Sequence, residues 1–281
     1  MLQGIKNLRI VSHLNKSSSL KENITIKLAS TSDEFFEAMW LISREYVRKG
    51  LIKSELKQPY FSPYLIIPNN RLLIALHGKQ IIGTISLIED SPIGIPMDNV
   101  HMNETVFLRK KSVKFAEIGS FAIDSNYQHL GITLQLYKAI FSYVCEYRNI
   151  EYILAAVHPR VAGIYKNLFK FEQVGDIQQY SKLNNAKSVP LQLNTANTIE
   201  FIKKTNAFDR NNYSYHTEHQ LNPNYEYYKN LNLNNANSDF YYIPLWQESH
   251  IKKYFNQCCV DVKSLPEQQR TIFQWLYPTL N

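Results

Sequence analysis

A glycine-containing turn lies between a predicted strand and a predicted amphipathic helix, and such a turn can hold an anion. The turn reads Gln128-His-Leu-Gly131-Ile-Thr133. A glycine here frees backbone N–H groups at the helix N-terminus, where they can bind a phosphate or pyrophosphate. Alternatively, Gly131 serves only to start the helix tightly, because glycine adopts conformations that other residues avoid. The motif alone leaves both interpretations open.

The sequence gives little support for a metal site or for a disulfide. His216 and His219 are spaced like a metal-binding pair, but a site needs a third ligand and the flanking residues indicate a loop. We therefore expect no metal. The chain has three cysteines, and Cys258 and Cys259 are adjacent, too close for an ordinary disulfide. Reduced thiols are expected.

The composition is that of a basic globular protein. The 281 residues carry a net charge of +7, with a pI near 9.1 and a mean hydropathy of -0.31. No apolar run approaches the roughly 18 residues that a membrane-spanning helix needs, and the N-terminal residues lack a signal-peptide core. We expect a cytoplasmic protein without a transmembrane segment. Acidic residues are interspersed with the basic ones, so the charge does not select nucleic acid, and no such partner is expected.

The elements that must position these residues alternate between strands and helices. Thr31 begins a capping-box spacing, which predicts a helix that ends at Gly50. A loop rich in proline and tyrosine follows and can place aromatic side chains beside a site. Hydrophobic periodicity then predicts a hairpin over 71–90, helices over about 103–111, 128–148 and from Pro159, and strands over 23–29, 115–124, 151–157, 172–180 and 188–194. This order is typical of an α/β fold with a mixed sheet.

The composition changes after Asn194. Asparagine and tyrosine become dense, which favours a surface loop, and Ser264 to Glu267 then has the spacing of a helix start. We expect an N-terminal lead over 1–22, an α/β core over 23–194, and a helical extension over 195–281 that packs on the core.

Two further segments carry a family resemblance. After the glycine turn, the strand over 151–157 is followed by His158-Pro-Arg160 and by Tyr165 on the next helix, and the glycine turn paired with this segment resembles the GNAT acyltransferase superfamily. The stretch from Gly83 to Glu117 resembles the long-chain N-acyl amino acid synthases, which are similar in fold to the GNAT enzymes and to acyl-homoserine lactone synthases. The matching residues are Asp90, Ser91, Pro92, Gly94, Pro96, Met97, Asp98, Glu104, Arg109, Glu117, Pro159, Arg160 and Tyr165.

The resemblance covers residues 23–194 and has departures. Ile95 stands for Leu, Val161 for His and Ile164 for Phe. The turn at Gly131 also lacks the second small residue of coenzyme A-binding relatives, which puts coenzyme A in doubt. The implied fold is a GNAT-like, mixed, mostly antiparallel sheet flanked by helices, with a C-terminal helical extension.

The resemblance implies transfer of a long acyl chain from the thioester of acyl carrier protein to the α-amine of an amino acid, giving a lipid of the bacterial signalling type. Such a reaction needs a proton acceptor for the ammonium group and a donor for the oxyanion. Glu117 is the leading general base, or else a strand-end carboxylate paired with a cation. Tyr165 is the general acid to the leaving thiolate, or else a packed core side chain.

The remaining roles also follow from the resemblance. No cofactor is expected to bind tightly. An acyl-CoA donor with another amine, or a catalytically silent module that binds a lipid or a partner, remain alternatives. Asp90 and Asp98 either bind the substrate or brace their loop, and the oligomeric state is unknown. The expected substrate-binding residues are Arg44, Asp90, Asp98, Glu104, Arg109, Ser120, Phe121 and Ala122, the donor loop contributes Gln128, Gly131 and Thr133, and the carrier protein docks on Lys110, Lys111, Lys114, Arg160 and Lys166.

Overall fold

A twisted eight-stranded sheet forms the centre of the molecule. The computed structural model describes residues 24–53, 58–148, 150–196 and 246–280. Neighbouring strands run in the order β1-β2-β3-β4-β5-β8, and both β6 and β7 pair with β8. All of these pairs are antiparallel except β4 with β5. The strands are β1 Ile24–Leu28, β2 Arg71–His77, β3 Gln80–Glu89, β4 Phe115–Ile123, β5 Tyr152–Val157, β6 Glu172–Gln173, β7 Gln178–Tyr180 and β8 Ala186–Asn194. The predicted mixed, mostly antiparallel sheet is confirmed.

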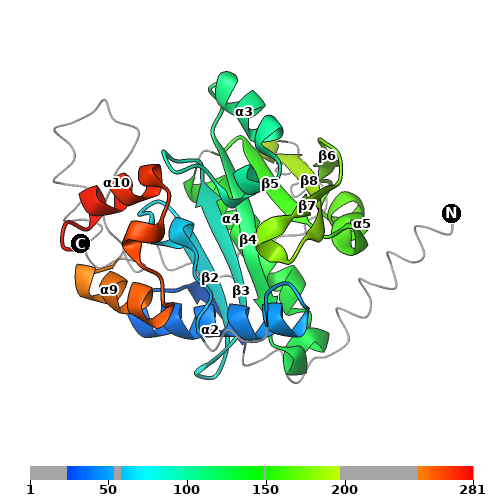
Figure 1. Cartoon of the computed structure of the whole chain (residues 1–281). Helices are drawn as coiled ribbons and strands as arrows, with labels where there is room; N and C mark the ends of the chain where they lie inside the picture. The colour runs from blue at the N-terminus through cyan, green and yellow to red at the C-terminus, as the bar shows by residue number, and fades with distance from the viewer. Residues whose placement is uncertain (1–23, 54–57, 149, 197–245, 281) are drawn as a thin grey trace, which may run out of the picture.

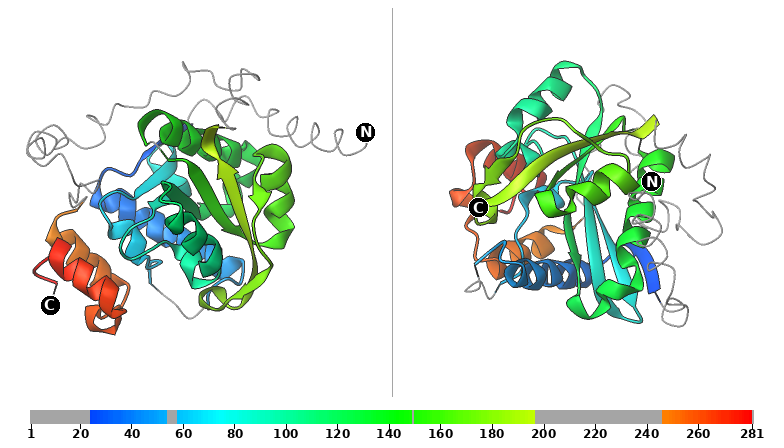
Figure 2. Two further views of the ribbon diagram at one scale, coloured as in Figure 1. Left: turned by 90° about the horizontal axis from the view of Figure 1, so that it is seen from above. Right: turned by 90° about the vertical axis from the view of Figure 1, so that its right-hand side faces the viewer.

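Helices cover both faces of the sheet. Helix α2 (Ser32–Arg48) packs on one face, and α4 (Ile132–Tyr147) with α5 (Pro159–Leu168) packs on the other (Figures 1 and 2). Each face has its own hydrophobic cluster, because successive side chains of a strand point to opposite sides. Helix α3 (Met102–Lys110) stands at the end of the sheet shown uppermost in Figure 1.

Helix α2 illustrates how local sequence signals define an element. The hydroxyl of Thr31 accepts a hydrogen bond from the Glu34 N–H at 3.2 Å, which satisfies one of the unpaired donors of the first turn. Phe35, Met39 and Ile42 then recur at helical spacing and are buried. The helix ends at Arg48, slightly before the predicted end at Gly50.

Two predicted elements are divided in the structure. The region predicted as one helix over 128–148 consists of a 3-10 helix, Ser125–Leu130, and of α4, with Gly131 between them at φ +71°. The region predicted as one strand over 172–180 contains β6 and β7, separated around Gly175. Glycine lacks a side chain that could pack along a strand, so it favours such a break.

Strands β4 and β5 separate after a short paired stretch. Their parallel register joins only Phe115–Glu117 to Tyr152–Leu154, although β4 continues to Ile123 and β5 to Val157. Glu117 is therefore the last residue of β4 that pairs with β5. The two strands diverge immediately beyond it.

The C-terminal helices pack beside α2. Helix α9 (Glu248–Gln257) and helix α10 (Glu267–Leu276) join the hydrophobic cluster on the α2 face, and Figure 1 shows them, orange and red, near one end of α2. The predicted helix is present, but it begins at Glu267 with Pro266 as its N-cap residue, and Ser264 ends a short 3-10 helix instead of capping it. Phe273 and Leu276 are buried, as the periodicity predicts. The asparagine cluster and the pair His216 and His219 lie outside the described residues. Within the part of the chain that is described, no helix has the length and apolarity needed to cross a bilayer.

The burial of α10 predicts that it contributes to global stability. Replacing Phe273, which is 0% exposed, by Ala should lower the free energy of unfolding by about 3–5 kcal/mol, because it removes a packed ring and leaves a cavity. Chemical denaturation of the full chain measures this change. The exposed neighbour Gln274 provides the control, and Gln274→Ala should change stability by no more than about 0.5 kcal/mol. Equal small effects of both variants would show that α10 does not belong to the core.

Candidate active site

The carboxyl group of Glu117 is buried inside the protein on the α2 side of the sheet. The side chain is 4% exposed, and its neighbours along β4, Ala116 and Ile118, point into the opposite cluster. One carboxylate oxygen, Oε2, accepts a hydrogen bond from the Met97 N–H at 2.6 Å. Burial raises the pKa of Glu117 to about 8, Met97 opposes this rise, and the nearby charge of Asp98 adds to it. A carboxyl group with this pKa titrates near neutrality, as a general base for an amine requires.

The charge of Glu117 raises the pKa of four tyrosines. They are Tyr46 on α2, Tyr60 and Tyr64 in the loop after α2, and Tyr180 on β7. Burial raises the pKa of each phenol, to about 12 for Tyr60, and the charge of Glu117 raises each pKa further. The four phenols therefore lie within electrostatic range of the Glu117 carboxylate.

Two of these tyrosines contact each other, and the other two form hydrogen bonds with the 3-10 helix Pro96–Asn99. The rings of Tyr46 and Tyr60 meet edge to face, with centroids 5.3 Å apart. The Tyr180 hydroxyl donates to the Pro96 carbonyl at 3.2 Å. Tyr64 accepts a hydrogen bond from the Asn99 amide at 3.1 Å. The sequence indicates only that the loop after α2 can place aromatic side chains beside a site. Tyr46 and Tyr180 come from other segments and are not predicted from sequence.

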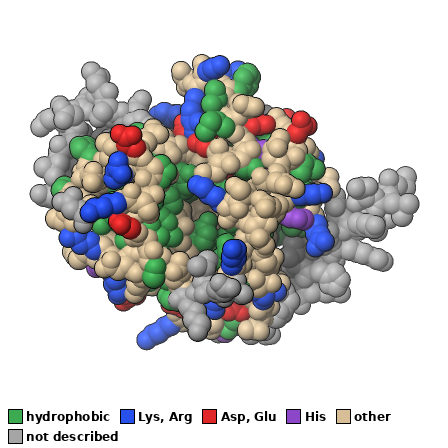
Figure 3. Space-filling model, in the orientation of Figure 1, with side chains coloured by type: hydrophobic (Ala, Val, Ile, Leu, Met, Phe, Trp, Pro, Cys, Tyr) green, Lys and Arg blue, Asp and Glu red, His purple; other side chains and the backbone are tan. Residues whose placement is uncertain are grey.

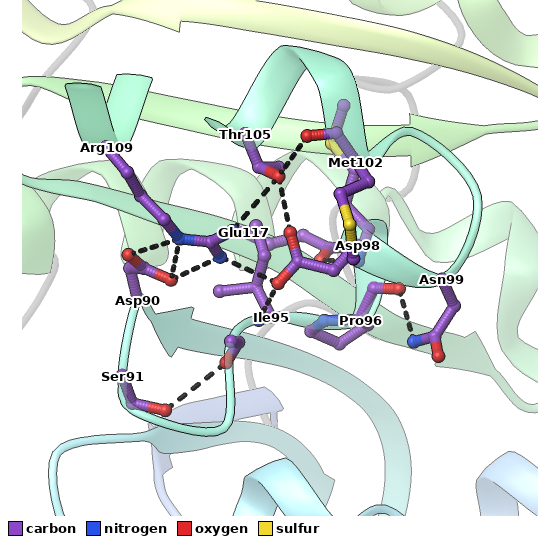
Figure 4. A network of polar contacts seen from close by, with 12 residues as sticks. Asp90, Ser91, Ile95, Pro96, Asp98, Asn99, Met102, Thr105, Arg109 and Glu117 are labelled. Atoms are coloured by element: carbon purple, nitrogen blue, oxygen red, sulfur yellow. Dashed lines mark hydrogen bonds and ion pairs between the residues drawn. The ribbon is translucent and has the colours of Figure 1, made fainter. Parts of the chain in front are cut away.

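An arginine bound to two aspartates supports the loop that carries Met97. Figure 4 shows Arg109 reaching from α3 between Asp90 and Asp98. Its guanidinium donates to both oxygens of Asp90, with Nη2 2.6 Å from Oδ1, and also to Oδ2 of Asp98 at 2.7 Å. Asp98 in turn accepts hydrogen bonds from the Ile95 N–H and from the hydroxyl of Thr105. In this structure the two aspartates brace their loop, which is one of the two interpretations that the sequence left open.

Gly94 allows this loop to fold around Asp98. Its φ is +73°, a conformation that residues with a side chain rarely adopt, and a Cβ here would overlap Oδ2 of Asp98. The 3-10 helix Pro96–Asn99 follows, and it places the Met97 N–H over Glu117. The glycine of the sequence motif is therefore needed for the backbone geometry.

A bulge in β4 lies just beyond Glu117. Ser86 pairs with Gly119 and Thr84 with Ala122, so Ser120 and Phe121 together face one residue of β3. Ser120 has φ +46°, and its carbonyl accepts a hydrogen bond from the Thr84 hydroxyl at 2.8 Å. Such bulges occur next to active sites, where they redirect the backbone. The expected substrate-binding residues Ser120, Phe121 and Ala122 thus lie where β4 and β5 diverge.

Tyr165 lies on α5, on the α4 side of the sheet. It is buried, and its hydroxyl makes a hydrogen bond with that of Tyr137. Burial raises its pKa to about 12, and the Tyr137 hydrogen bond opposes this rise. Burial raises the pKa of Tyr46, and the charges of Tyr165 and of Glu117 add to this rise.

Other predicted site residues lie away from this network. Arg44 is on the exposed side of α2, and Glu104 lines an open pocket with Met102 and Gln178. In the predicted donor loop, Gly131 begins α4, Thr133 is half-buried in its first turn, and Gln128 is exposed. The described residues contain no cluster of side chains that could hold a metal ion.

The predicted docking residues are all exposed. Lys110 and Lys111 end α3, Lys114 precedes β4, and Arg160 and Lys166 lie on α5. On the face shown in Figure 3, lysine and arginine side chains are scattered around a central area of hydrophobic side chains. The five positive charges are therefore accessible, but they come from separate elements.

The conformation of Gly94 predicts that glycine-to-alanine substitutions at two positions will affect stability differently. Gly94→Ala should destabilise the protein by about 2 kcal/mol or more, because it combines a positive φ with an overlap on Asp98. Gly163→Ala on α5 should be neutral or stabilise by up to about 1 kcal/mol, since nothing lies near the added methyl group and alanine favours a helix. Denaturation of both variants tests this. A neutral Gly94→Ala would contradict the loop geometry.

The raised pKa of Glu117 predicts a pH-dependent cost to stability. Because the folded pKa of about 8 exceeds the ordinary value of 4.5, the stabilising contribution of the protonated form is present below pH 4.5 and is lost as the pH rises to 8. Glu117→Gln has no such loss, so its stability relative to the unsubstituted protein should grow by about 1.4 kcal/mol per pH unit in this window. A difference that does not vary with pH would contradict a raised pKa.

Comparisons with known proteins support an acyltransferase fold. The solved structure of FeeM, an N-acyl amino acid synthase from uncultured soil microbes, superposes with a TM-score of 0.58 at 23% identity, covering 66% of this chain and 98% of that chain. An acyl-CoA N-acyltransferase from Pseudomonas aeruginosa gives a TM-score of 0.41 at 13% identity, covering 60% of this chain and 97% of that chain. No curated protein sequence matches significantly.

A family model described as "N-acyl amino acid synthase FeeM" matches residues 37–194. This range is more than half of the chain, and it contains Glu117, the Asp90–Asp98 loop, Arg109 and Tyr165. The fold expected from the sequence is confirmed by the FeeM structure. The chain belongs to the FeeM family of N-acyl amino acid synthases and is an N-acyltransferase.

Proposed function

We propose that this protein transfers a long-chain acyl group from the thioester of acyl carrier protein to the α-amine of an amino acid, with Glu117 as the general base. One observation carries the proposal. Glu117 is a buried carboxyl group with a pKa of about 8, located where β4 and β5 separate. Membership of the FeeM family supports the acyl and amino acid substrates.

The chemistry begins with the amine. The α-ammonium group of the amino acid loses a proton to the Glu117 carboxylate, and the neutral amine then attacks the thioester carbonyl carbon. A C–N bond forms, the carbonyl oxygen becomes an oxyanion, and the nitrogen loses a second proton to solvent. Backbone N–H groups at the β4 bulge are the proposed oxyanion donors, since donors aimed at the developing charge lower the barrier.

Collapse of the tetrahedral intermediate breaks the C–S bond. The leaving thiolate takes a proton from the Tyr165 hydroxyl, which is later restored from solvent. Burial raises the pKa of Tyr165 to about 12, so the phenol stays protonated until the thiolate forms.

The donor is proposed to be a carrier protein because of charge. Carrier proteins are acidic, and the chain has a net charge of +7 with exposed Lys110, Lys111, Lys114, Arg160 and Lys166. Complementary charge accelerates association and is screened by salt. Acyl-CoA as donor is the alternative. No cofactor takes part in the proposed reaction.

A direct assay tests the reaction. The purified full chain is incubated with long-chain acyl carrier protein or acyl-CoA and with a mixture of the twenty amino acids, and products are identified by mass spectrometry. We expect N-acyl amino acids from the carrier-protein donor, with a rate that falls as salt is added. Product from acyl-CoA alone would replace the proposed donor, and no product from any pairing would contradict the function.

The two proposed catalytic residues make a second prediction. Glu117→Gln should lower kcat by about 100-fold or more, the usual contribution of a general base, while Tyr165→Phe should slow thiolate departure. In the unsubstituted protein, kcat/KM should rise with pH and level off above about 8, because the carboxylate is the active form. Exposed Glu172 supplies the control, and Glu172→Gln should leave the rate unchanged. Full activity in both catalytic variants would remove these roles, whereas loss with an intact fold argues against a silent binding module.

A further inference from the structure

The loop that carries Tyr60 and Tyr64 has little regular structure of its own. Its described part runs from residue 58 to residue 70 and contains only the 3-10 helix Pro63–Ile66. Buried backbone N–H and C=O groups need hydrogen-bond partners, and a loop cannot supply them from a helix or sheet. Part of this need is met by α2, since the Tyr60 N–H donates to the Met39 carbonyl at 3.1 Å.

The hydroxyl of Tyr254 on α9 provides hydrogen-bond partners for two further backbone groups of the loop, as an acceptor and as a donor. The hydroxyl accepts a hydrogen bond from the Ser62 N–H at 2.9 Å and donates one to the Tyr60 carbonyl at 2.8 Å. Tyr254 is 0% exposed. A single side chain from the C-terminal region thus fixes the backbone on both sides of Phe61.

Aromatic packing fixes the position of this hydroxyl. The Tyr254 ring stacks on Phe61 with centroids 5.4 Å apart and meets Phe35 of α2 edge to face at 5.0 Å. The next turn of the helix adds Cys258, whose thiol lies 3.5 Å from the Pro59 carbonyl. Figure 1 shows α9 beside the end of α2. Tyr254 is therefore a rigid support, since its ring cannot move without disturbing three elements.

We propose that Tyr254 is a positioning residue for the active site, which acts by fixing the backbone of the loop that carries Tyr60 and Tyr64. Helix α9 lies outside residues 37–194, the range that matches the family model. The inference rests on the proposed role of Glu117 and extends it to a segment of the chain to which the family match assigns nothing.

The mechanism of this positioning is exclusion of water. The loop reaches the Glu117 site through Tyr64, whose hydroxyl accepts from Asn99, two residues after the Met97 N–H that donates to Glu117. The titratable groups within electrostatic range of Glu117 are Tyr46 on α2, Tyr60 and Tyr64 in the loop, Tyr180 on β7 and Asp98 in the 3-10 helix Pro96–Asn99. Arg109 is bound to Asp98. Loss of the Tyr254 hydroxyl frees the Tyr60 carbonyl and the Ser62 N–H, which water can then solvate. A carboxyl group that gains water returns toward its ordinary pKa.

The test separates positioning from stability through Tyr254→Phe, which keeps the ring and removes only the hydroxyl. Glu117→Gln is made both in the unsubstituted protein and in Tyr254→Phe. In each background, the stability difference that Glu117→Gln causes is measured by denaturation from pH 4.5 to 9. We expect the upper end of the pH-dependent window to fall by about one pH unit or more in Tyr254→Phe. The pH midpoint of kcat/KM should fall by the same amount.

A matched control comes from α10. The Tyr277 hydroxyl donates to the Ile66 carbonyl at 2.6 Å, and Tyr277 is also 0% exposed. Ile66 belongs to the same loop and follows Tyr60 and Tyr64 in the sequence. Tyr277→Phe should lower stability without moving either midpoint. Unchanged midpoints in Tyr254→Phe, with stability lowered, would reduce Tyr254 to a structural role and overturn the proposal. An equal shift in both variants would also overturn it, because the effect would then belong to the C-terminal helices in general.

The stability readout does not require turnover. If no substrate pair gives product, the proposed function fails, yet the pH window of stability still reports whether Tyr254 controls the environment of Glu117. If product forms and Glu117→Gln is inactive while the Tyr254→Phe midpoints are unchanged, the proposed function stands and the positioning role fails.

Discussion

The structure depends on the burial of one carboxyl group. A charge moved out of water is costly, so a buried carboxyl group stays protonated until the pH approaches its raised pKa. Glu117 is the last residue of β4 that pairs with β5, its carboxylate accepts from the Met97 N–H, and its charge acts on tyrosines from three segments. Burial of Glu117 lowers the stability of the protein at neutral pH and above. The same burial produces a carboxyl group that titrates in the range where amines can be deprotonated.

Asp98 shows how the surrounding charges are arranged. A negative charge close to a carboxyl group raises the pKa of that group. Asp98 supplies such a charge beside Glu117, and it is held in place by Arg109 and by the hydroxyl of Thr105. The motif from Asp90 to Asp98 thus has two effects: it fixes the loop that donates to Glu117, and its Asp98 charge adds to the rise in the Glu117 pKa that burial causes.

The sequence predicted the parts of this site that are local. Capping and periodicity predicted α2, α3 and most strands, and the motif from Asp90 to Glu117 identified the central carboxyl group and its bracing loop. The sequence could not predict which tyrosines lie in electrostatic range of Glu117, because Tyr46, Tyr60 and Tyr180 are brought together by packing between distant segments. The contact of Tyr254 with Tyr60, across 194 positions, has no local signal either. Gly131 has the positive φ that glycine permits at a helix start, and its role in binding the donor stays a prediction.

The most direct test of the account is the titration of Glu117 itself. The carboxyl carbons of glutamate are labelled with ¹³C in the full chain, and the Glu117 resonance is assigned as the one missing from Glu117→Gln. We expect a chemical-shift titration with a midpoint near pH 8. A midpoint near the ordinary value of 4.5 would mean that the carboxyl group is ionised and solvated at neutral pH, and it would contradict both the buried environment and the proposed base.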